Sequence, residues 1–140
     1  MPLYAVIDTN VLVSALLTHS DTSPPLKVIM AMYDGIIVPV YSKEILAEYK
    51  EVLSRGKFNF SRRVIETAMH AITENGIERS GIPTEETPSD PKDVIFYEVT
   101  MDARQEHDAR LVTGNTKDFP AKPFIVTPAE MLRIIEENRK

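Results

Sequence analysis

The sequence predicts an α/β fold with three layers, in which helices cover both faces of a central parallel sheet of four to five strands. Short apolar segments rich in β-branched residues alternate along the chain with segments whose apolar residues recur at helical spacing. No internal repeat, low-complexity tract or linker interrupts this alternation. The length of 140 residues is close to the commonest domain size, so we expect residues 1–140 to form a single domain.

Residues 1–40 are expected to contain two strands and two helices. Residues 3–7 and 36–40 are short, continuous apolar runs typical of buried strands. A mostly apolar helix is expected over residues 10–17. Ser23 and Pro24 favour the start of another helix, because a hydroxyl can cap its first turn and proline fits there. The apolar residues of that helix recur at helical spacing: Leu26, Ile29, Met30 and Tyr33.

The remaining elements continue the alternation. Ser42 and Ser61 can cap two successive helices, and a third is expected from Pro91 to about Arg104. Residues 77–91 are rich in proline and polar residues, and one short strand is expected there, near residues 77–82. Further strands are expected over residues 109–113 and 124–126. A capping box, Thr127-Pro128-Ala129-Glu130, begins the last helix.

Composition excludes several classes of function. The 21 acidic and 16 basic residues give a net charge of -5, which argues against non-specific coating of nucleic acid. The absence of cysteine excludes disulfides, zinc ribbons, thiol nucleophiles and iron–sulfur clusters, and fits a reducing cytosol. No apolar stretch resembles a signal peptide or approaches the roughly 20 residues of a membrane span. We therefore expect a cytoplasmic protein that does not enter a membrane.

Acidic residues follow the predicted strands, at the edge where open α/β sheets bind ligands. Asp8 follows the first strand, Glu44 lies just past the second, and Asn115 and Asp118 follow the strand over residues 109–113. Asp93, with Asp90, begins the helix before that strand. Clustered carboxylates repel one another and raise each other's pKa, a conflict that Mg²⁺ or Mn²⁺ removes. The pattern therefore predicts metal-assisted hydrolysis of a phosphate ester.

Each of these acids also has a structural explanation. Glu44 and Asp93 stand in first helical turns, where carboxylates favour the helix dipole, and Asp118 could be a solvated loop residue. For Asp90 we prefer the role of helix cap before Pro91. Asp8 could begin a turn, but a carboxylate beside a buried strand is costly, which favours a functional role there.

Four blocks of the sequence stand out: residues 4–15, with Asp-Thr-Asn after the first predicted strand, and residues 42–49, 90–96 and 111–119, each with acidic residues. In this order they resemble the opening and the later acidic blocks of PIN-domain proteins. The chain looks most like small prokaryotic PIN proteins described as toxins of toxin–antitoxin pairs. The resemblance implies a metal-dependent endoribonuclease on a five-stranded parallel sheet. It also implies a protein antitoxin and a homodimer.

The resemblance assigns roles to individual residues. Asp8, Glu44 and Asp93 would hold Mg²⁺ or Mn²⁺, Asn10 would support the site by hydrogen bonds, and Thr113 would line it. Two departures weaken the match. Many relatives carry Asp at the position of Asn115, so Asp118 is a candidate for the missing catalytic acid. Relatives also often have a second Asp where Val94 follows Asp93. The alternative is a weakly active or non-catalytic module that binds RNA or a protein partner.

The basic residues gather in one stretch. Residues 41–64 carry six bases and three acids, whereas residues 74–108 carry ten acids and three bases. Because phosphate contacts need basic groups, RNA is expected along the helices of the first stretch. The candidate contacts are Lys43, Lys50, Arg62 and Arg63, although each could simply belong to a solvated helix face. For Phe58 and Phe60 we prefer core packing to base stacking, and for His70 and His107 a structural or surface role.

Other phosphate-processing folds fit less well. A haloacid-dehalogenase-type phosphatase needs a second acid two residues after the first, where this chain has Asn10. The five glycines form neither a P-loop nor a dinucleotide-binding loop. A receiver domain shares the fold class, but its acidic pair and phosphoacceptor have no match in this sequence.

Overall fold

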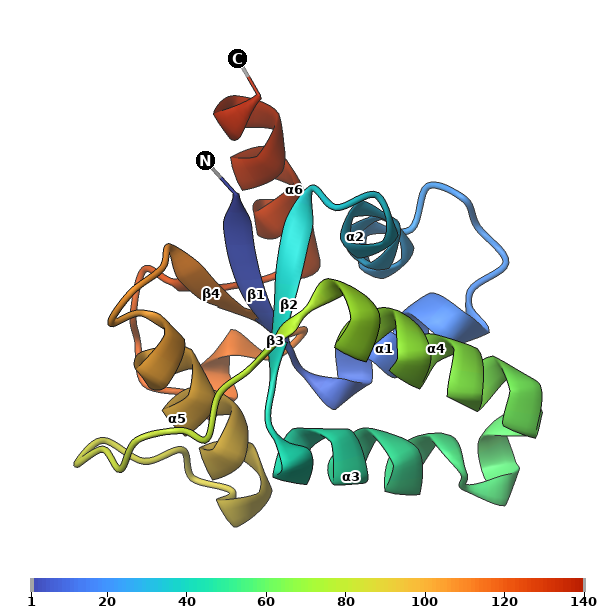
Figure 1. Cartoon of the computed structure of the whole chain (residues 1–140), viewed down its shortest axis with the longest axis horizontal. Helices are drawn as coiled ribbons and strands as arrows, with labels where there is room; N and C mark the ends of the chain where they lie inside the picture. Colours follow the sequence, from blue (N-terminus) through green and yellow to red (C-terminus); the bar gives the residue numbers. More distant parts are fainter. Residues whose placement is uncertain (1, 140) are drawn as a thin grey trace.

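The structure, a computed structural model, describes residues 2–139 and has a five-stranded parallel sheet at its centre (Figure 1). The predicted α/β class is confirmed, and the sheet has five strands where four to five were expected. In chain order the strands are β1 (Leu3–Ile7), β2 (Ile37–Tyr41), β3 (Ile77–Glu78), β4 (Ala109–Val112) and β5 (Ile125–Val126). The helices are α1 (Thr9–Leu17), α2 (Pro24–Tyr33), α3 (Lys43–Leu53), α4 (Arg62–Asn75), α5 (Val94–Ala103) and α6 (Pro128–Asn138).

Strand β1 lies at the middle of the sheet, in the spatial order β3-β2-β1-β4-β5. Its Leu3 pairs with Ile37 of β2, and its Ile7 pairs with Val112 at the end of β4. The chain adds β2 and β3 on one side of β1 and then adds β4 and β5 on the other. The carboxyl ends of β1 and β4 therefore form a topological switch point, where open α/β sheets place their ligand sites.

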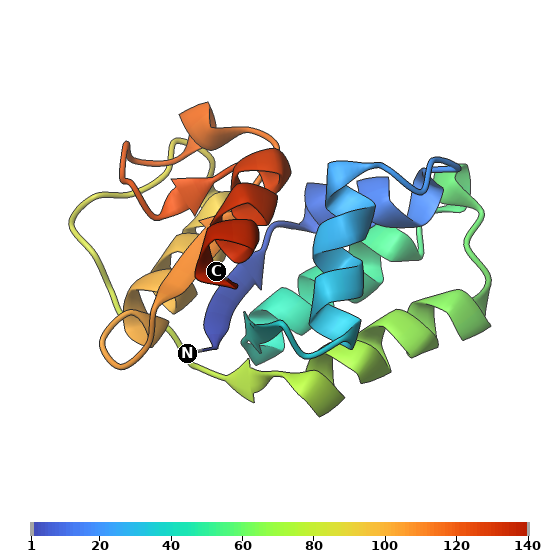
Figure 2. The ribbon, with the colours of Figure 1, turned by 90° about the horizontal axis from the view of Figure 1, so that it is seen from above.

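Helices lie on both sides of the sheet, as predicted. Helix α5 packs against β1, β2 and β4, whereas α2 and α4 pack against β2 on the opposite side, with α6 beside α2 (Figure 2). The largest fully buried side chains join these layers: Tyr49, Tyr97, Phe96, Leu12 and Met32. Helix α3 runs along the carboxyl edge of the sheet in Figure 1, where Tyr49 donates a buried hydrogen bond to the carbonyl of Ile7. This bond fixes α3 against the end of β1.

Most helix starts follow the predicted caps. The side chains of Ser42, Ser61 and Thr127 accept hydrogen bonds from first-turn amides, and Thr127 forms the complete capping box with Glu130. The helix start predicted at Ser23 and Pro24 is confirmed, but the hydroxyl cap predicted there is wrong, since the Ser23 side chain makes no capping bond. The physical reason is that both residues after Ser23 are prolines, so few first-turn N–H groups remain to be satisfied.

Residues 76–81 carry the chain from α4 across the edge of the sheet. The strand there is only Ile77–Glu78, shorter than the region in which it was expected. Arg79 bridges Asp102 and Glu106 of the α5 region, with N–O distances of 3.2 and 3.0 Å. Gly76 permits the crossing, because a Cβ there would clash with two backbone carbonyl oxygens, those of Pro39 and Ile72.

Two further predictions concern membrane insertion and aromatic packing. None of the helices within residues 2–139 is both long and apolar enough to span a bilayer. Phe58 and Phe60 stack on each other with ring centroids 5.7 Å apart and pack against the core, as preferred. His107 stacks on Tyr4 at 4.0 Å, which agrees with a structural role.

Candidate active site

A small hollow of about 180 Å³ opens at the carboxyl edge of the sheet, beside the switch point. Four acidic side chains, which come from three separate segments of the chain, line this hollow together with two basic side chains. The lining residues are Asp8, Thr9, Asn10, Glu48, Val52, Arg55, Asp90, Lys92, Asp93 and Phe96. Acids from distant parts of the sequence therefore come together, as expected. Asp8 and Asp93 are among them, but Glu48 lines the hollow and Glu44 does not.

Asp8 follows β1 directly and occupies the N-cap position of α1, where its side chain makes no capping bond. Only 7% of its surface is exposed. The hydroxyl of Thr113, which is fully buried at the end of β4, donates to Asp8 Oδ2 at 2.7 Å. Burial raises the pKa of Asp8, and the bond from Thr113 opposes that rise. A buried carboxylate with one oriented oxygen is thus fixed at the centre of the site.

Asp93 precedes α5, in the short 3-10 turn Pro91–Asp93. Partial burial and the negative charges of Asp8, Asp90, Asp118 and Glu48 raise its pKa to about 6. Three of these four neighbours, Asp8, Asp90 and Glu48, line the same hollow as Asp93. Asp90 also caps the turn, since its Oδ1 accepts from the amide of Lys92 at 3.0 Å, and this confirms the preferred role.

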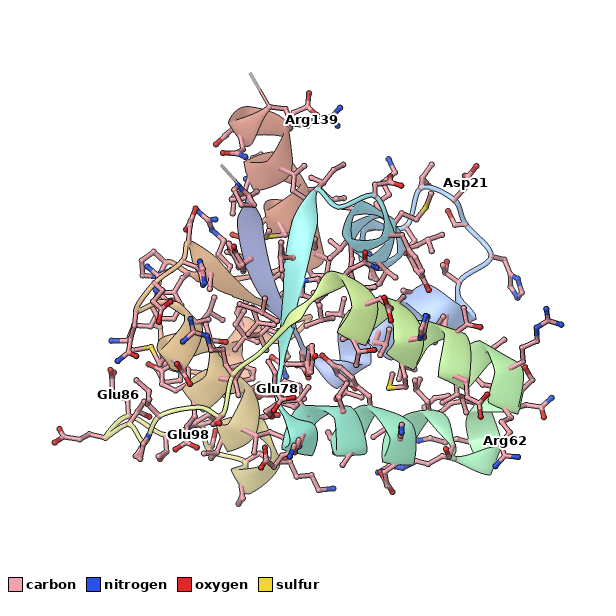
Figure 3. The ribbon with its side chains drawn as sticks, viewed as in Figure 1. Asp21, Arg62, Glu78, Glu86, Glu98 and Arg139 are labelled. Carbon is pink, nitrogen blue, oxygen red and sulfur yellow. The ribbon has the colours of Figure 1, made fainter. Side chains whose placement is uncertain are left out.

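The acid that α3 contributes to the hollow is Glu48. The hydroxyl of Thr9, next to Asp8, donates to Glu48 Oε2 at 2.9 Å. Glu44, the residue that the sequence indicated, lies one helical turn earlier and lines a separate polar hollow with Glu78 and Arg79. Figure 3 shows Glu78 beside the start of α3. Sequence reasoning missed Glu48, although it stands one residue before the core residue Tyr49 and four residues after Glu44.

The segment after β4 is tied to the same group of acids. The amide of Asn115 donates to Thr113 Oγ1 at 3.1 Å, and its side-chain Nδ2 donates to Asp118 Oδ2 at 2.8 Å. Asp118 lies close enough to raise the pKa of Asp93. In place of the expected acid, Asn115 thus holds a neighbouring carboxylate in position.

The oxygen donors of this site suit a hard divalent cation without forming a closed cage. No group of three or more His, Asp or Glu side chains that could hold a metal ion by itself occurs within residues 2–139. Mg²⁺ usually keeps several waters and is bound by one or two carboxylates together with substrate phosphates. Asp8 and Asp93, an all-oxygen pair with raised pKa values, fit that mode of binding.

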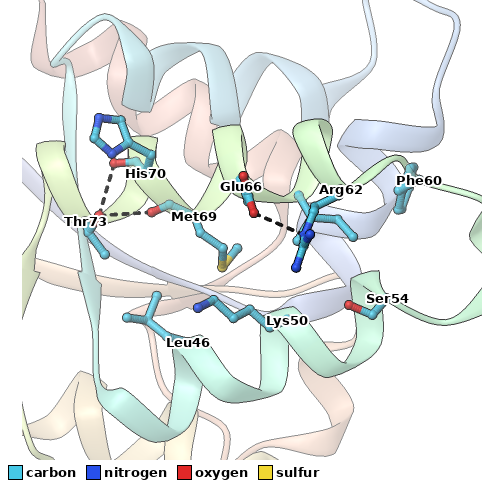
Figure 4. Close-up of a pocket in the computed structure, with 10 residues that line it drawn as sticks. Leu46, Lys50, Ser54, Phe60, Arg62, Glu66, Met69, His70 and Thr73 are labelled. Atoms are coloured by element: carbon cyan, nitrogen blue, oxygen red, sulfur yellow. Dashed lines mark hydrogen bonds and ion pairs between the residues drawn. The ribbon is translucent and has the colours of Figure 1, made fainter.

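The basic residues predicted to contact RNA lie elsewhere. Lys50 and Arg62 line a larger groove of about 680 Å³ between α3 and α4, together with the apolar side chains of Leu46, Phe60, Ile65 and Met69 (Figure 4). Arg62 is paired there with Glu66 at 3.4 Å. Lys43 lines the polar hollow beside Glu44. Arg63 is exposed on α4. Within the described residues, the lining of the acidic hollow includes none of these four basic side chains.

Comparison with known families agrees with this geometry. A family model described as a PIN domain matches residues 4–117. The match contains every residue that lines the acidic hollow and ends one residue before Asp118. Comparison with curated proteins and with solved structures gives no significant match.

Proposed function

Because the chain belongs to the PIN-domain family, whose members are generally nucleases, we propose that it is a divalent-metal-dependent endoribonuclease that hydrolyses RNA phosphodiester bonds. One observation carries this proposal. The buried carboxylate of Asp8 shares a hollow with Glu48 and Asp93, which come from different segments, at the switch point of the sheet. Structural acids are usually dispersed and solvated, whereas acids whose charges oppose one another in one cleft are typical of functional sites.

The residues in and beside the hollow divide into proposed metal ligands and residues that orient them. Asp8 and Asp93 would hold Mg²⁺ or Mn²⁺, with Glu48 and Asp118 as further oxygen donors. When bound, the cation supplies an activated water and offsets the negative charge of the phosphodiester. Thr113 orients Asp8, Thr9 orients Glu48, and Asn115 holds Asp118. Asn10, an exposed residue of the lining, is available to bind a water or substrate oxygen.

The biological setting is part of the same proposal. The sequence blocks around Asp8, Glu48, Asp93 and Asn115 resemble those of small prokaryotic toxin components. We therefore propose a cytoplasmic toxin that is inhibited by a protein antitoxin and acts as a homodimer.

The test is cleavage of single-stranded RNA by the purified protein with Mn²⁺ or Mg²⁺. We expect cleavage that EDTA abolishes, and a loss of kcat/KM of at least about 100-fold in Asp8→Asn. Asp21→Asn, which changes an exposed acid in the loop before α2, is the matched control and should be active (Figure 3). The proposal fails if the wild-type protein cleaves no RNA with either ion, or if Asp8→Asn is fully active.

A second candidate function rests on the amide at Asn115 and on the open arrangement of the carboxylates. A PIN fold that lacks one acidic charge could bind RNA or a protein partner without hydrolysis. Tight RNA binding without cleavage in the presence of Mn²⁺ would favour this function over the nuclease. Restoring the acid with Asn115→Asp should then create or increase metal-dependent cleavage.

A further inference from the structure

Two cationic side chains, those of Arg55 and Lys92, line the acidic hollow. Its four carboxylates repel a polyanion, so a nucleic-acid substrate needs positive charge close to the site. Arg55 follows the end of α3, and Lys92 lies in the short turn before α5, so separate segments supply that charge. Their position in the lining distinguishes them from the basic residues on the α3–α4 groove.

Arg55 is held in a way that leaves it available. Its Nη2 lies 2.8 Å from Oε2 of Glu51, in a pair whose side chains are 41% and 62% exposed. An exposed pair of this kind contributes little free energy, so a phosphate can replace or share the partner. The planar guanidinium has five N–H donors and can bind a phosphate through two of them at once.

Lys92 presents its charge from a fixed turn. Its backbone amide donates to Asp90, while no ion pair engages its exposed ammonium group within residues 2–139. Asp90 and Asp93, which flank the residue in the turn, line the same hollow. A compact ammonium with three rotatable donors suits contact with a phosphate that passes the rim of the hollow.

On these grounds we propose that Arg55 and Lys92 bind backbone phosphates of a single-stranded RNA next to the bond that is cleaved. The inference rests on the proposed function, because it takes RNA as the substrate of this hollow. It assigns RNA affinity to these two residues in place of Lys43, Lys50, Arg62 and Arg63. Arg55 and Lys92 are therefore binding residues, and their loss should raise KM far more than it lowers kcat.

The experiment measures binding of a fluorescent single-stranded RNA by anisotropy in EDTA, so that no cleavage occurs. We expect Arg55→Ala and Lys92→Ala each to weaken binding about tenfold, as the loss of one charge-assisted phosphate contact predicts. Each should also flatten the dependence of log K on log salt by about 0.7. The matched controls Lys50→Ala and Arg62→Ala remove equal charge from the α3–α4 groove and should leave affinity within about twofold.

Two further variants separate binding from a structural role. Glu51→Gln breaks the ion pair of Arg55 but should bind RNA at least as tightly as the wild type. Arg55→Lys should keep the salt dependence and recover part of the affinity. The inference is overturned if Arg55→Ala and Lys92→Ala bind like the controls, or if the wild-type protein binds no RNA with or without Mn²⁺. Failure of cleavage with these binding effects intact would overturn only the nuclease function.

Discussion

The hydrogen bond from Thr113 to Asp8 offers a direct test of how the site is built. Thr113→Val replaces the hydroxyl with a methyl group of nearly the same size, so packing is little changed. Thr113 is fully buried and Asp8 is 7% exposed, so water cannot readily replace the lost donor. A hydrogen bond to a charged group contributes about 1.5–3 kcal/mol, and we expect the free energy of unfolding to fall by that amount at pH 8.

The loss should depend on pH in a predictable direction. Burial already raises the pKa of Asp8 above its ordinary value, and removing Thr113 as donor raises that pKa further. Such a carboxyl destabilises the fold when it is ionised, so the penalty is greatest at alkaline pH. It shrinks as pH falls through the raised pKa and Asp8 takes up a proton.

Urea unfolding across a series of buffers from pH 8 to pH 4 measures this dependence. Thr113→Ser, which keeps the hydroxyl, is the matched control and should not show the pH-dependent loss. Equal stability of Thr113→Val and the wild type at pH 8 would refute the reasoning. A deficit of the same size at every pH would also refute it, because that result would indicate packing or the lost bond from the Asn115 amide to Thr113 Oγ1, and not the charge of Asp8.

The remaining predictions concern the carboxylates and one glycine. Glu48→Gln should lower kcat/KM for RNA by about 10–100-fold, whereas Glu44→Gln, one turn earlier, should leave it unchanged; the reverse order would reinstate Glu44. Since the pKa of Asp93 is raised to about 6 and ligands must be ionised, Mn²⁺ affinity measured by calorimetry should rise through about pH 6 and then level off; a flat profile would contradict this. Gly76→Ala forces a Cβ against two backbone carbonyls and should cost about 3 kcal/mol in thermal unfolding, while Gly56→Ala, with open space around it, should be neutral.

The order and type of the elements could be predicted from the sequence because each depends on local chemistry. Apolar runs bounded by polar residues produced the strands, and the hydroxyl caps at Ser42, Ser61 and Thr127 mark the helix starts that the structure contains. The cap at Ser23 failed through its proline neighbours. The length of β3 could not be read locally either. After Arg79 the chain bonds to α5 in place of β2, since the amides of Gly81 and Ile82 donate to Asp102 and Glu98.

Within the candidate site, the sequence could place the residues that directly follow a strand, but it could not say which face of a helix turns toward them. Asp8 and Thr113 follow neighbouring parallel strands, so their contact follows from topology once β1 and β4 are adjacent. Asp93 was found because it begins a helix at the same edge. The basic residues were chosen by local charge alone, which does not say which face of a helix meets the acids. Lys50 and Arg62 therefore lie on the α3–α4 groove.

The difference between Glu44 and Glu48 follows from where the second strand lies. Strand β2 is one position away from the switch point, between β1 and β3. An acid that directly follows β2 therefore lies near the outer strand β3, and Glu44 lines a hollow there together with Glu78. Helix α3 then runs toward β1, where Tyr49 bonds to the carbonyl of Ile7. One turn, about 5–6 Å of rise, is what brings an acid from the edge of β3 to Asp8. The acid of α3 that lines the hollow with Asp8 therefore stands on the second turn of the helix, beside the buried Tyr49.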